Sequence, residues 1–559
     1  MKSPHAFRGV FRSDELARAV YSEAAGVARI LPAAVAVPAD AEDVVALVVW
    51  AAANDVALVP RGAGSSMAGG ALGDGVIVDF ARLDDAPTFD PSTRLVRVGP
   101  AVTRERLEEV ASRAGLTFPV DPSSGSFAAL GGMCATNAAG ARSVKYGAMR
   151  AWVHGLDCVF ADGARGWLRR SGRDSRDGPD HADSGAEYGA DIPAVQRFLR
   201  DVAPRVIAAD AHVLRHVGVR KESSGYGLAA WSESGDAVDL IIGSEGTLAC
   251  IVGVELRLAP LPAASASLLA GFADLEAAAA AAVQLAALGA SAVEMLDRTF
   301  LEIAASEGNA LPLPAHLEAV LLVEVEARSA PDVRHAARTL AEHCQAAGAV
   351  HLELASDAAS EAKLWQLRHA ASPILNRLAP RLRNMQIVED GCVPPDRFAA
   401  YVRGVREALA AARFRGVIFG HAGDGHAHVN ALVDVTEADW RARVERLLVD
   451  VTALVARLGG TLTGEHGDGR LRSPLLPQVW PAEALALFAA TKEAFDPDGV
   501  FNPGVKVPAA GARPLADMKY DASLPSLPSA SRAALDLVVR ERAWGRHRLD
   551  LLPVSNASR

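Results

Sequence analysis

The stretch Gly420–Asn430 reads GHAGDGHAHVN and follows an apolar run at residues 417–419. The run predicts a strand, the glycines predict a loop, and residues 426–430 predict a returning strand. Because a strand points successive side chains to opposite faces, alternate residues of the returning strand share one face. The side chains that can meet there across the turn are His421, His426, His428 and Asn430. The stretch therefore predicts a hairpin that gathers imidazoles in one place.

A second polar cluster, Gly464–Arg470, reads GEHGDGR. One carboxylate and two imidazoles suffice to hold a divalent metal with one position left open for a substrate. Two such clusters in one chain favour a metal site over the alternative of surface loops with scattered histidines.

The composition is that of a soluble globular protein with more than one core. Of the 559 residues, 50% are hydrophobic and 22% charged, so we expect two or three domains. The sequence has no unbroken apolar run of about 18 residues and no apolar signal core, which predicts a cytoplasmic protein. The net charge of −10 argues against nucleic acid as a main partner. Five scattered cysteines without a CxxC pair predict reduced thiols and no iron–sulfur site.

Two stretches rich in small residues occur in the N-terminal half. PRGAGSSMAGG at Pro60–Gly70 follows an apolar run at residues 56–59 that predicts a strand. Glycines let a backbone approach a ligand closely, and successive N–H groups in a tight loop can cradle a phosphate. The loop has neither the GxGxxG pattern nor a GK[ST] ending, so a flexible turn is an equal alternative. LGGMCATNAAG at Leu130–Gly140 predicts either close backbone packing or a backbone wrapped along an extended ligand.

Five motifs in order resemble those of a known family. PRGAGSS, the DPSS…GGMCATNAAG stretch, GSEGTLACI and FDPDGVFNPG resemble the FAD-binding oxidoreductases of the vanillyl-alcohol oxidase, PCMH type. Within that group, GHAGDGHAHVN with GEHGDGR resembles the FAD-linked D-2-hydroxyacid dehydrogenases. These include D-lactate dehydrogenase, the glycolate oxidase flavin subunit and D-2-hydroxyglutarate dehydrogenase. The resemblance covers roughly residues 30–506.

The resemblance implies an α+β fold, with a two-subdomain PCMH-type FAD-binding domain and an α+β cap domain that carries an antiparallel sheet. The expected parts are an N-terminal helical segment (1–31), the FAD-binding domain (32–260), the cap or substrate domain (261–430), a C-terminal helical segment returning to the flavin (431–506), and a linker with a tail helix (507–559). The tail resembles the connector to an iron–sulfur module in longer relatives. A tail packed on its own domain is the equal alternative.

By resemblance, three groups of residues would bind FAD. The pyrophosphate group is Pro60, Arg61, Gly62, Ala63, Gly64, Ser65 and Ser66. The group along the ribityl chain and the ring is Asp121, Pro122, Ser123, Gly131, Gly132, Asn137 and Gly140. The group by the adenosine half is Glu245, Gly246 and Ile251, and Asn502 would close over the flavin. The pyrophosphate loop has no histidine of the kind that joins flavin in covalent members, so we expect non-covalent FAD.

Oxidation of a 2-hydroxy acid requires a base for the hydroxyl proton, a grip on the carboxylate and a C–H bond directed at flavin N5. We assign His421, His428 and Glu465 as ligands of a divalent metal, expected to be zinc, with manganese or iron open and His426 in reserve. The metal would lower the pKa of the hydroxyl group. His466 is the candidate base, Arg368 on a predicted helix would grip the carboxylate, and Asn430 would orient the substrate.

We therefore expect FAD-dependent oxidation of a D-2-hydroxy acid, such as D-lactate, with electrons passed to a quinone, a cytochrome or an iron–sulfur protein. The region 386–394 lacks the lysine that helps D-2-hydroxyglutarate dehydrogenases hold the distal carboxylate, and it contains Glu389. This weakens a dicarboxylate assignment and leaves it open. A metal-dependent hydrolase and a non-catalytic flavin subunit are the alternatives. We also expect a homodimer, with peripheral attachment at the inner face of the membrane left open.

Overall fold

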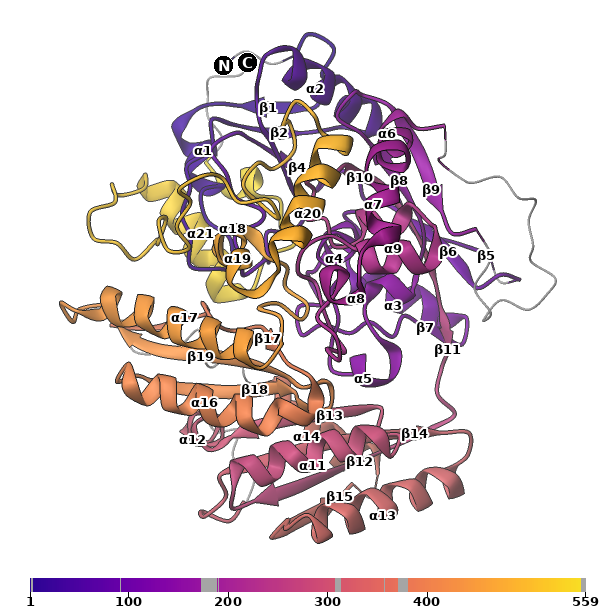
Figure 1. The fold of residues 1–559 in the computed structure, drawn as a ribbon, viewed down its shortest axis with the longest axis vertical. Coiled ribbons are helices and arrows are strands. Elements are labelled where there is room, and N and C mark those ends of the chain that lie inside the picture. Colours follow the sequence, from indigo (N-terminus) through magenta and orange to yellow (C-terminus); the bar gives the residue numbers. More distant parts are fainter. Residues whose placement is uncertain are drawn as a thin grey trace.

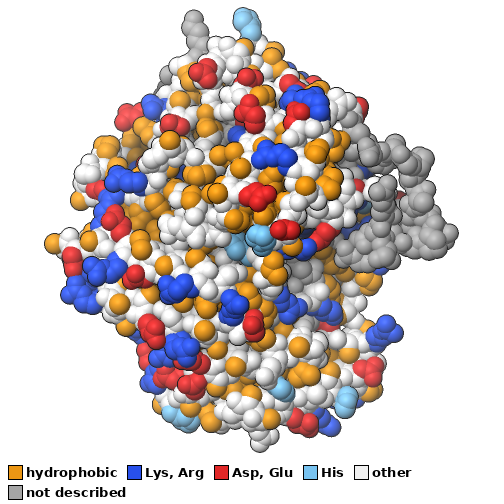
Figure 2. Space-filling view, in the orientation of Figure 1, with side chains coloured by type: hydrophobic (Ala, Val, Ile, Leu, Met, Phe, Trp, Pro, Cys, Tyr) orange, Lys and Arg blue, Asp and Glu red, His pale blue; other side chains and the backbone are white. Residues whose placement is uncertain are grey.

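The computed structural model describes residues 1, 4–90, 92–171, 189, 191–306, 313–355, 357–369 and 381–553. The N-terminal half and the C-terminal helices form one lobe, and a sheet covered by long helices forms the other (Figure 1). Acidic and basic side chains are interspersed on the face shown in Figure 2.

The first sheet leads into the glycine-rich loop. Its strand order is β1 (Val10–Arg12), β2 (Ala34–Val37), β4 (Val76–Asp79) and β3 (Leu58–Arg61). Strands β2, β4 and β3 are parallel, and the helix α2 (Ala41–Ala53) forms the crossover from β2 to β3, which lie on either side of β4. Strands β2 and β4 are buried along their whole length, which explains their unbroken apolar sequences.

The N-terminal segment, predicted to be helical, contains a strand as well as a helix. Helix α1 spans Glu15–Val20, whereas β1 pairs antiparallel with β2. The VFR sequence of β1 has the β-branched and aromatic side chains that suit a strand, and the edge of β2 supplies its hydrogen bonds. Among the described residues 1 and 4–31, the helical prediction is therefore correct only for α1.

A second, antiparallel sheet completes the FAD-binding half. Its order is β5 (Thr88–Asp90), β6 (Leu95–Val98), β10 (Cys250–Arg257), β8 (Val153–Val159) and β9 (Arg165–Arg169). A separate ribbon pairs β7 (Leu116–Thr117) with β11 (Ala259–Pro260). The helices of this half are α3 (Arg104–Arg113), α4 (Leu130–Thr136), α5 (Ser143–Tyr146), α6 (Pro193–Asp201), α7 (Ala203–Ala208), α8 (Ala211–Leu214), α9 (Leu228–Ser234) and α10 (Val238–Ile241).

The other lobe contains an eight-stranded antiparallel sheet, as expected for the cap. Its strands are β15 (His351–Leu354), β12 (Ala264–Phe272), β14 (Ala319–Ala327), β13 (Ala292–Asp297), β18 (Arg415–His421), β19 (His426–Asp434) and β16 (Leu382–Met385), with β17 (Gly391–Cys392) also paired to β19. One face packs on α11 (Leu275–Ala287), α13 (Ala330–Ala346), α16 (Phe398–Ala411) and α17 (Trp440–Arg457). The opposite face packs on α12 (Arg298–Ser306) and α14 (Ala358–His369).

The predicted hairpin is present as β18 and β19, with Phe419 paired to His428. The turn needs glycine because Gly420 and Gly425 adopt φ values of +138° and +73°. Strand β19 continues past residue 430 to Asp434, and α17 packs beside α16. The cap sheet and its helices thus extend beyond the boundary placed at residue 430.

The C-terminal part returns to the FAD-binding half. Helices α18 (Gly469–Arg472), α19 (Leu476–Val479) and α20 (Ala482–Phe495) follow the second polar cluster, and α20 packs on α6. The tail helix α21 (Ser529–Glu541) packs on α1, beside which Figure 1 draws it in yellow. Among the described residues, no helix combines the length and apolarity needed to span a bilayer. All five cysteines are buried free thiols.

Candidate active site

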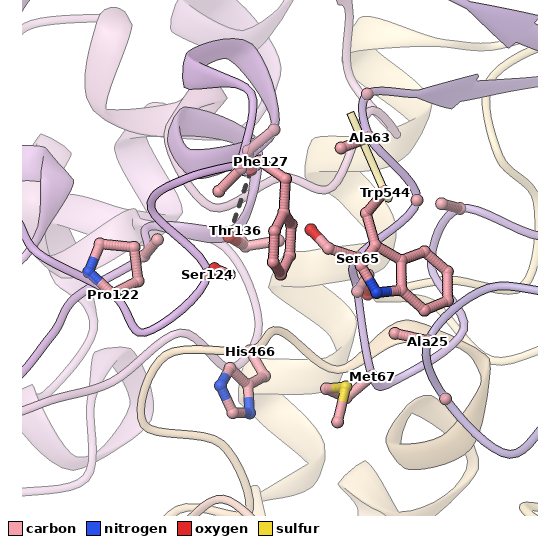
Figure 3. A pocket seen from close by; sticks show the side chains of 18 of the residues that line it. Ala25, Ala63, Ser65, Met67, Pro122, Ser124, Phe127, Thr136, His466 and Trp544 are labelled. Atoms are coloured by element: carbon pink, nitrogen blue, oxygen red, sulfur yellow. Dashed lines mark hydrogen bonds between the residues drawn. The ribbon is translucent and has the colours of Figure 1, made fainter. Parts of the chain in front are cut away.

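A cavity of about 1400 Å³ opens where the FAD-binding half, the cap and the tail meet. The loop at residues 60–66 and the stretch at residues 121–132 line it, together with side chains from both polar clusters. In Figure 3, Ser65 and Phe127 lie on one side of the cavity, and His466 and Met67 lie on the other. The volume exceeds the roughly 300–1,000 Å³ of a typical small-molecule site, which leaves room for an extended ligand and a smaller one.

The three residues predicted to hold a metal converge on one carboxylate oxygen. Oε1 of Glu465 lies 3.2 Å from Nε2 of His421 and 3.4 Å from Nε2 of His428. His421 stands at the end of β18 and His428 lies in β19, so the hairpin register places both rings beside the loop of Glu465. All three residues are buried.

The other ring nitrogens of these histidines are occupied. Nδ1 of His421 lies 2.5 Å from Oε1 of Glu294, and Nδ1 of His428 lies 2.9 Å from the carbonyl oxygen of Glu389. With a cation bound, these acceptors would hold the proton of each ring on Nδ1 and leave Nε2 as the ligand atom. Histidines that ligate metals are held by the same kind of outer partner. The donor set of two imidazoles and a carboxylate therefore fits a divalent cation.

His426 lies close enough to His421, His428 and Glu465 to share a cation with them, but both of its ring nitrogens have other partners. Its Nδ1 lies 3.2 Å from Nζ of Lys221, and its Nε2 lies 2.9 Å from Oδ1 of Asp390. Burial and the Lys221 ammonium lower the pKa of His426 to about 3, so the ring is neutral. With an ammonium donor on one nitrogen and a carboxylate acceptor on the other, this histidine braces the site and has no free lone pair for a metal.

Lys221 also fixes the orientation of Glu465. Its Nζ lies 2.7 Å from Oε2 of Glu465, which leaves Oε1 facing the two imidazoles. Burial favours the neutral carboxyl, but Lys221 and His421 hold the pKa of Glu465 well below its usual range. The glutamate is therefore an anion.

The predicted base, His466, lies beside the metal-ligand set at the cavity. Its Nδ1 is 2.6 Å from Oε2 of Glu389, and its Nε2 is 3.6 Å from Oε1 of Glu465. Burial lowers the pKa of His466, but the carboxylates of Glu389 and Asp390 outweigh it and raise that pKa to about 10. Glu389 is in turn paired with Arg472, so the negative charge that the sequence suggested at residue 389 is compensated.

Two more predicted residues line the same cavity. Arg368 on α14 donates through Nε to the Glu294 carboxylate and stands over the ring of Phe419. Asn430 is buried, and its Oδ1 has no hydrogen-bond partner among the described residues. A buried acceptor without a partner is costly, so Asn430 is placed to receive a hydrogen bond from a bound molecule.

The glycine-rich loop has room and donors for a phosphate group. An added Cβ at Gly132 would meet nothing within 4 Å, so the cavity floor is open there. The buried Oγ of Ser66 has no partner among the described residues. The Arg61 guanidinium instead points into the protein, where it donates to the carbonyls of Tyr21 and Glu23. The loop thus fits the FAD pyrophosphate through its backbone and serines, with the Arg61 side chain supporting it from behind.

Most of the residues predicted to contact FAD line this cavity. They are Pro60, Arg61, Gly62, Ala63, Gly64, Ser65, Ser66, Asp121, Pro122, Ser123, Gly131, Gly132, Glu245, Gly246 and Ile251. The buried Glu245 carboxylate accepts from the backbone nitrogens of Asp468 and Gly469, at 2.7 and 3.0 Å, and contacts Lys506. Its side chain fastens the second polar cluster to the FAD-binding half.

Three predicted cofactor residues are absent from the cavity lining. Asn137 ends α4 with φ of +51° and lines a separate cavity of about 740 Å³. Gly140 is required by close packing, since an added Cβ would lie 2.1 Å from the carbonyl oxygen of Asp121. Asn502 donates to the carbonyls of Gly70 and Glu245 and accepts from Arg470. Each supports the cavity wall from behind.

Four charged residues of the site were missed by the sequence analysis. They are Lys221, Glu294, Asp390 and Arg472. Asp390 accepts from the backbone nitrogens of Glu465 and His466, so it joins β17 and the second cluster. None lies in a glycine/histidine motif, and their only signal is a charged side chain inside a buried stretch.

Comparisons with known proteins agree with this division of the chain. A family model described as "FAD binding domain" matches residues 32–168, and one described as "FAD linked oxidases, C-terminal domain" matches residues 261–505. An uncharacterized FAD-linked oxidoreductase of Mycobacterium tuberculosis is 30% identical over 85% of this chain and 90% of its own. The glycolate oxidase subunit GlcD of Bacillus subtilis is 28% identical over 88% of this chain and 93% of its own.

A D-lactate dehydrogenase of Archaeoglobus fulgidus is 28% identical over 84% of this chain and 89% of its own. Among solved structures, the 4-ethylphenol oxidase of Gulosibacter chungangensis superposes with a TM-score of 0.64 at 14% identity, covering 90% of this chain and 95% of that chain. This likeness shows the shared fold. The chain therefore belongs to the FAD-linked oxidoreductases that join an FAD binding domain to the C-terminal domain of FAD linked oxidases.

Proposed function

We propose that this protein oxidises a small D-2-hydroxy acid to the 2-oxo acid with non-covalent FAD and a divalent metal, zinc in the first instance. The observation that supports it most is the convergence of His421 and His428 on Oε1 of Glu465 at the wall of the cavity that the FAD loops line. Relatives named as a glycolate oxidase subunit and as D-lactate dehydrogenase fit the same substrate class.

The chain's own residues would have separate roles in the reaction. When bound, the cation at Glu465 would lower the pKa of a contacting hydroxyl and of the neighbouring His466, while FAD would take up the hydride. Nε2 of His466 would accept the hydroxyl proton, since Glu389 and Asp390 stabilise the imidazolium that results.

Arg368 would bind the substrate carboxylate with the end of its guanidinium group. Its Nε is tied to Glu294, and its two terminal nitrogens have no partner among the described residues. Glu294 also bonds to His421. One carboxylate therefore orients both Arg368, which would bind the substrate, and a proposed metal ligand. Asn430, whose buried Oδ1 has no partner among the described residues, would help to orient the substrate.

An anaerobic titration tests the proposal. The purified protein should be yellow, and one acid among D-lactate, glycolate, D-malate and D-2-hydroxyglutarate should bleach the flavin. A metal-dependent hydrolase would be colourless, and a non-catalytic flavin subunit would stay yellow with every acid. The electron acceptor (a quinone, a cytochrome or an iron–sulfur protein), the homodimer and the membrane attachment stay predictions of the sequence.

A further inference from the structure

The C-terminal segment at residues 529–552 is anchored on the FAD-binding half. It consists of α21 and a short turn at Arg548–Leu551. Its buried apolar side chains join the hydrophobic core around α1 and the first sheet. The tail members of that core are Ala534, Leu535 and Leu552. The segment is therefore a fixed wall of the molecule.

This segment ties together the two stretches that line the cavity. Arg548 donates to the carbonyl oxygen of Ala63 at 3.4 Å, in the loop predicted to hold pyrophosphate. Arg542 donates to the carbonyl oxygen of Ser123 at 3.2 Å and stands over the ring of Phe127. One short segment thus spans from the first glycine-rich stretch to the second.

The same segment faces the cavity. Its lining side chains are Arg532, Asp536, Val539, Arg540, Arg542 and Trp544. Arg532 is paired with Asp536 and Glu23, and Arg540 with Glu541. Arg542 has no carboxylate partner among the described residues, so its charge suits a phosphate-bearing ligand. Trp544 lies beside Ser65 and Ala63, on the side of the cavity away from His466 (Figure 3).

Arg548 holds Trp544 in place and adds to the positive field. Its guanidinium stands 5.2 Å from the centre of the indole ring. The side chain is buried, and its Nε has no hydrogen-bond partner among the described residues. It neighbours the buried Arg61, and burial with this repulsion lowers the pKa of Arg548 to about 10. The buried Asp79 offsets part of the charge of both arginines, and an anion held by the nearby loop would offset more of it.

We infer that residues 529–552 form the outer wall of the FAD site, with Trp544 contacting the pyrophosphate–adenosine half of the cofactor and Arg542 holding the Ser123 loop beside the ribityl chain. The inference rests on the proposed binding of FAD and adds residues that lie outside the matched FAD binding domain at 32–168. The segment would retain the non-covalent cofactor by closing over the part of FAD most distant from the chemistry.

Comparison of two flavins tests this assignment. FMN shares the isoalloxazine ring and one phosphate with FAD but lacks the adenosine half. Flavin would be removed from the wild-type protein and from the variants Trp544→Leu and Arg542→Gln, and the dissociation constants of FAD and FMN measured by fluorescence titration. We expect Trp544→Leu to bind FAD about 5- to 150-fold more weakly, the range for losing one base-stacking contact, with FMN affinity unchanged. Arg542→Gln should weaken the binding of both flavins, because the ribityl chain is common to them.

The matched control is Arg546→Gln, an exposed arginine of the same segment that does not line the cavity. It should bind both flavins like the wild type. Equal FAD affinity in Trp544→Leu and the wild type would overturn the inference, and so would an equal loss of FAD and FMN affinity in Trp544→Leu. If the wild-type protein bound no FAD, the proposed function itself would fail, which is a separate outcome.

Discussion

The ammonium group of Lys221 lies 2.7 Å from Oε2 of Glu465, inside the protein and 244 positions earlier in the chain. The pair leaves the second carboxylate oxygen to His421 and His428. A buried ion pair contributes little net stability, but breaking it leaves one uncompensated charge. Lys221 therefore positions Glu465, a proposed metal ligand, and compensates its negative charge when no cation is bound.

Replacing this lysine should make stability depend on metal. In Lys221→Met the buried Glu465 loses its cation, and we expect a loss of about 3–5 kcal/mol of unfolding free energy in a chelator. Added Zn²⁺ should recover much of this loss, because the metal would supply the missing positive charge. Thermal unfolding with and without Zn²⁺ measures the effect. The exposed Lys363→Met is the control, and an equal melting temperature with and without metal in Lys221→Met would contradict the prediction.

Replacing a proposed metal ligand should remove the metal and leave the flavin bound. We expect His428→Ala to keep its FAD but lose its metal, with flavin reduction slowed more than 100-fold, since changes in outer partners alone cost about 10–100-fold. A chelator should do the same to the wild-type protein and leave its colour. Metal analysis and anaerobic stopped-flow absorbance provide the readouts. His335→Ala on the exposed face of α13 should behave like the wild type. Full metal content in His428→Ala would remove it from the ligand set.

Removal of the proposed base should leave both cofactors bound. His466→Ala should slow flavin reduction by about 10²- to 10⁴-fold, the usual contribution of a positioned base. FAD and metal contents should match those of the wild type, because His466 lies beside the metal-ligand set. Normal reduction in this variant would show that the proton leaves by another route.

A buried aspartate in the cap should give stability a distinct pH dependence. Asp297 accepts a hydrogen bond from the backbone nitrogen of Phe300, and burial raises the pKa of Asp297 to about 7 against the weaker opposing fields of Arg406 and Arg415. The folded state therefore binds this proton more tightly than the unfolded state, so stability falls as pH rises from about 4 to 7.

The variant Asp297→Asn removes this charge and keeps the acceptor oxygen. It should exceed the wild type in stability at pH 8, by up to the order of 4 kcal/mol that a pKa displaced from about 4 to about 7 implies. The advantage should vanish near pH 4. Thermal unfolding across this range tests it, with the exposed helix cap Asp274→Asn as the control for charge loss. A difference that does not change with pH would refute the expectation.

Local pattern predicted the parts of the site that depend on neighbours in the sequence. Alternation along residues 426–430 predicted the face shared by His428 and Asn430, and the glycines predicted the turn. The acids that begin α2 and the left-handed Gly115 that ends α3 are equally local signals, and both are present.

Long-range pairing could not be predicted in this way. Lys221 has no periodicity that relates it to Glu465, and Glu294 meets His421 only because β13 pairs with β18. The small residues of the second glycine-rich stretch could contact a ligand or pack against the protein backbone, and the sequence does not separate these alternatives. In the structure, Gly132 faces the open cavity, whereas Gly140 packs against the backbone of Asp121. Distinguishing a contact with ligand from a contact with protein required the fold.

The contact between Ala63 and Arg548 joins positions 485 residues apart. At about 5–20 residues per second, a ribosome needs roughly half a minute to a minute and a half to translate that interval. During this time the nucleotide loop is already made but lacks its outer cover, so a nascent chain would hold cofactor loosely. Tight binding of the cofactor would then have to wait until the segment at residues 529–552 has been made.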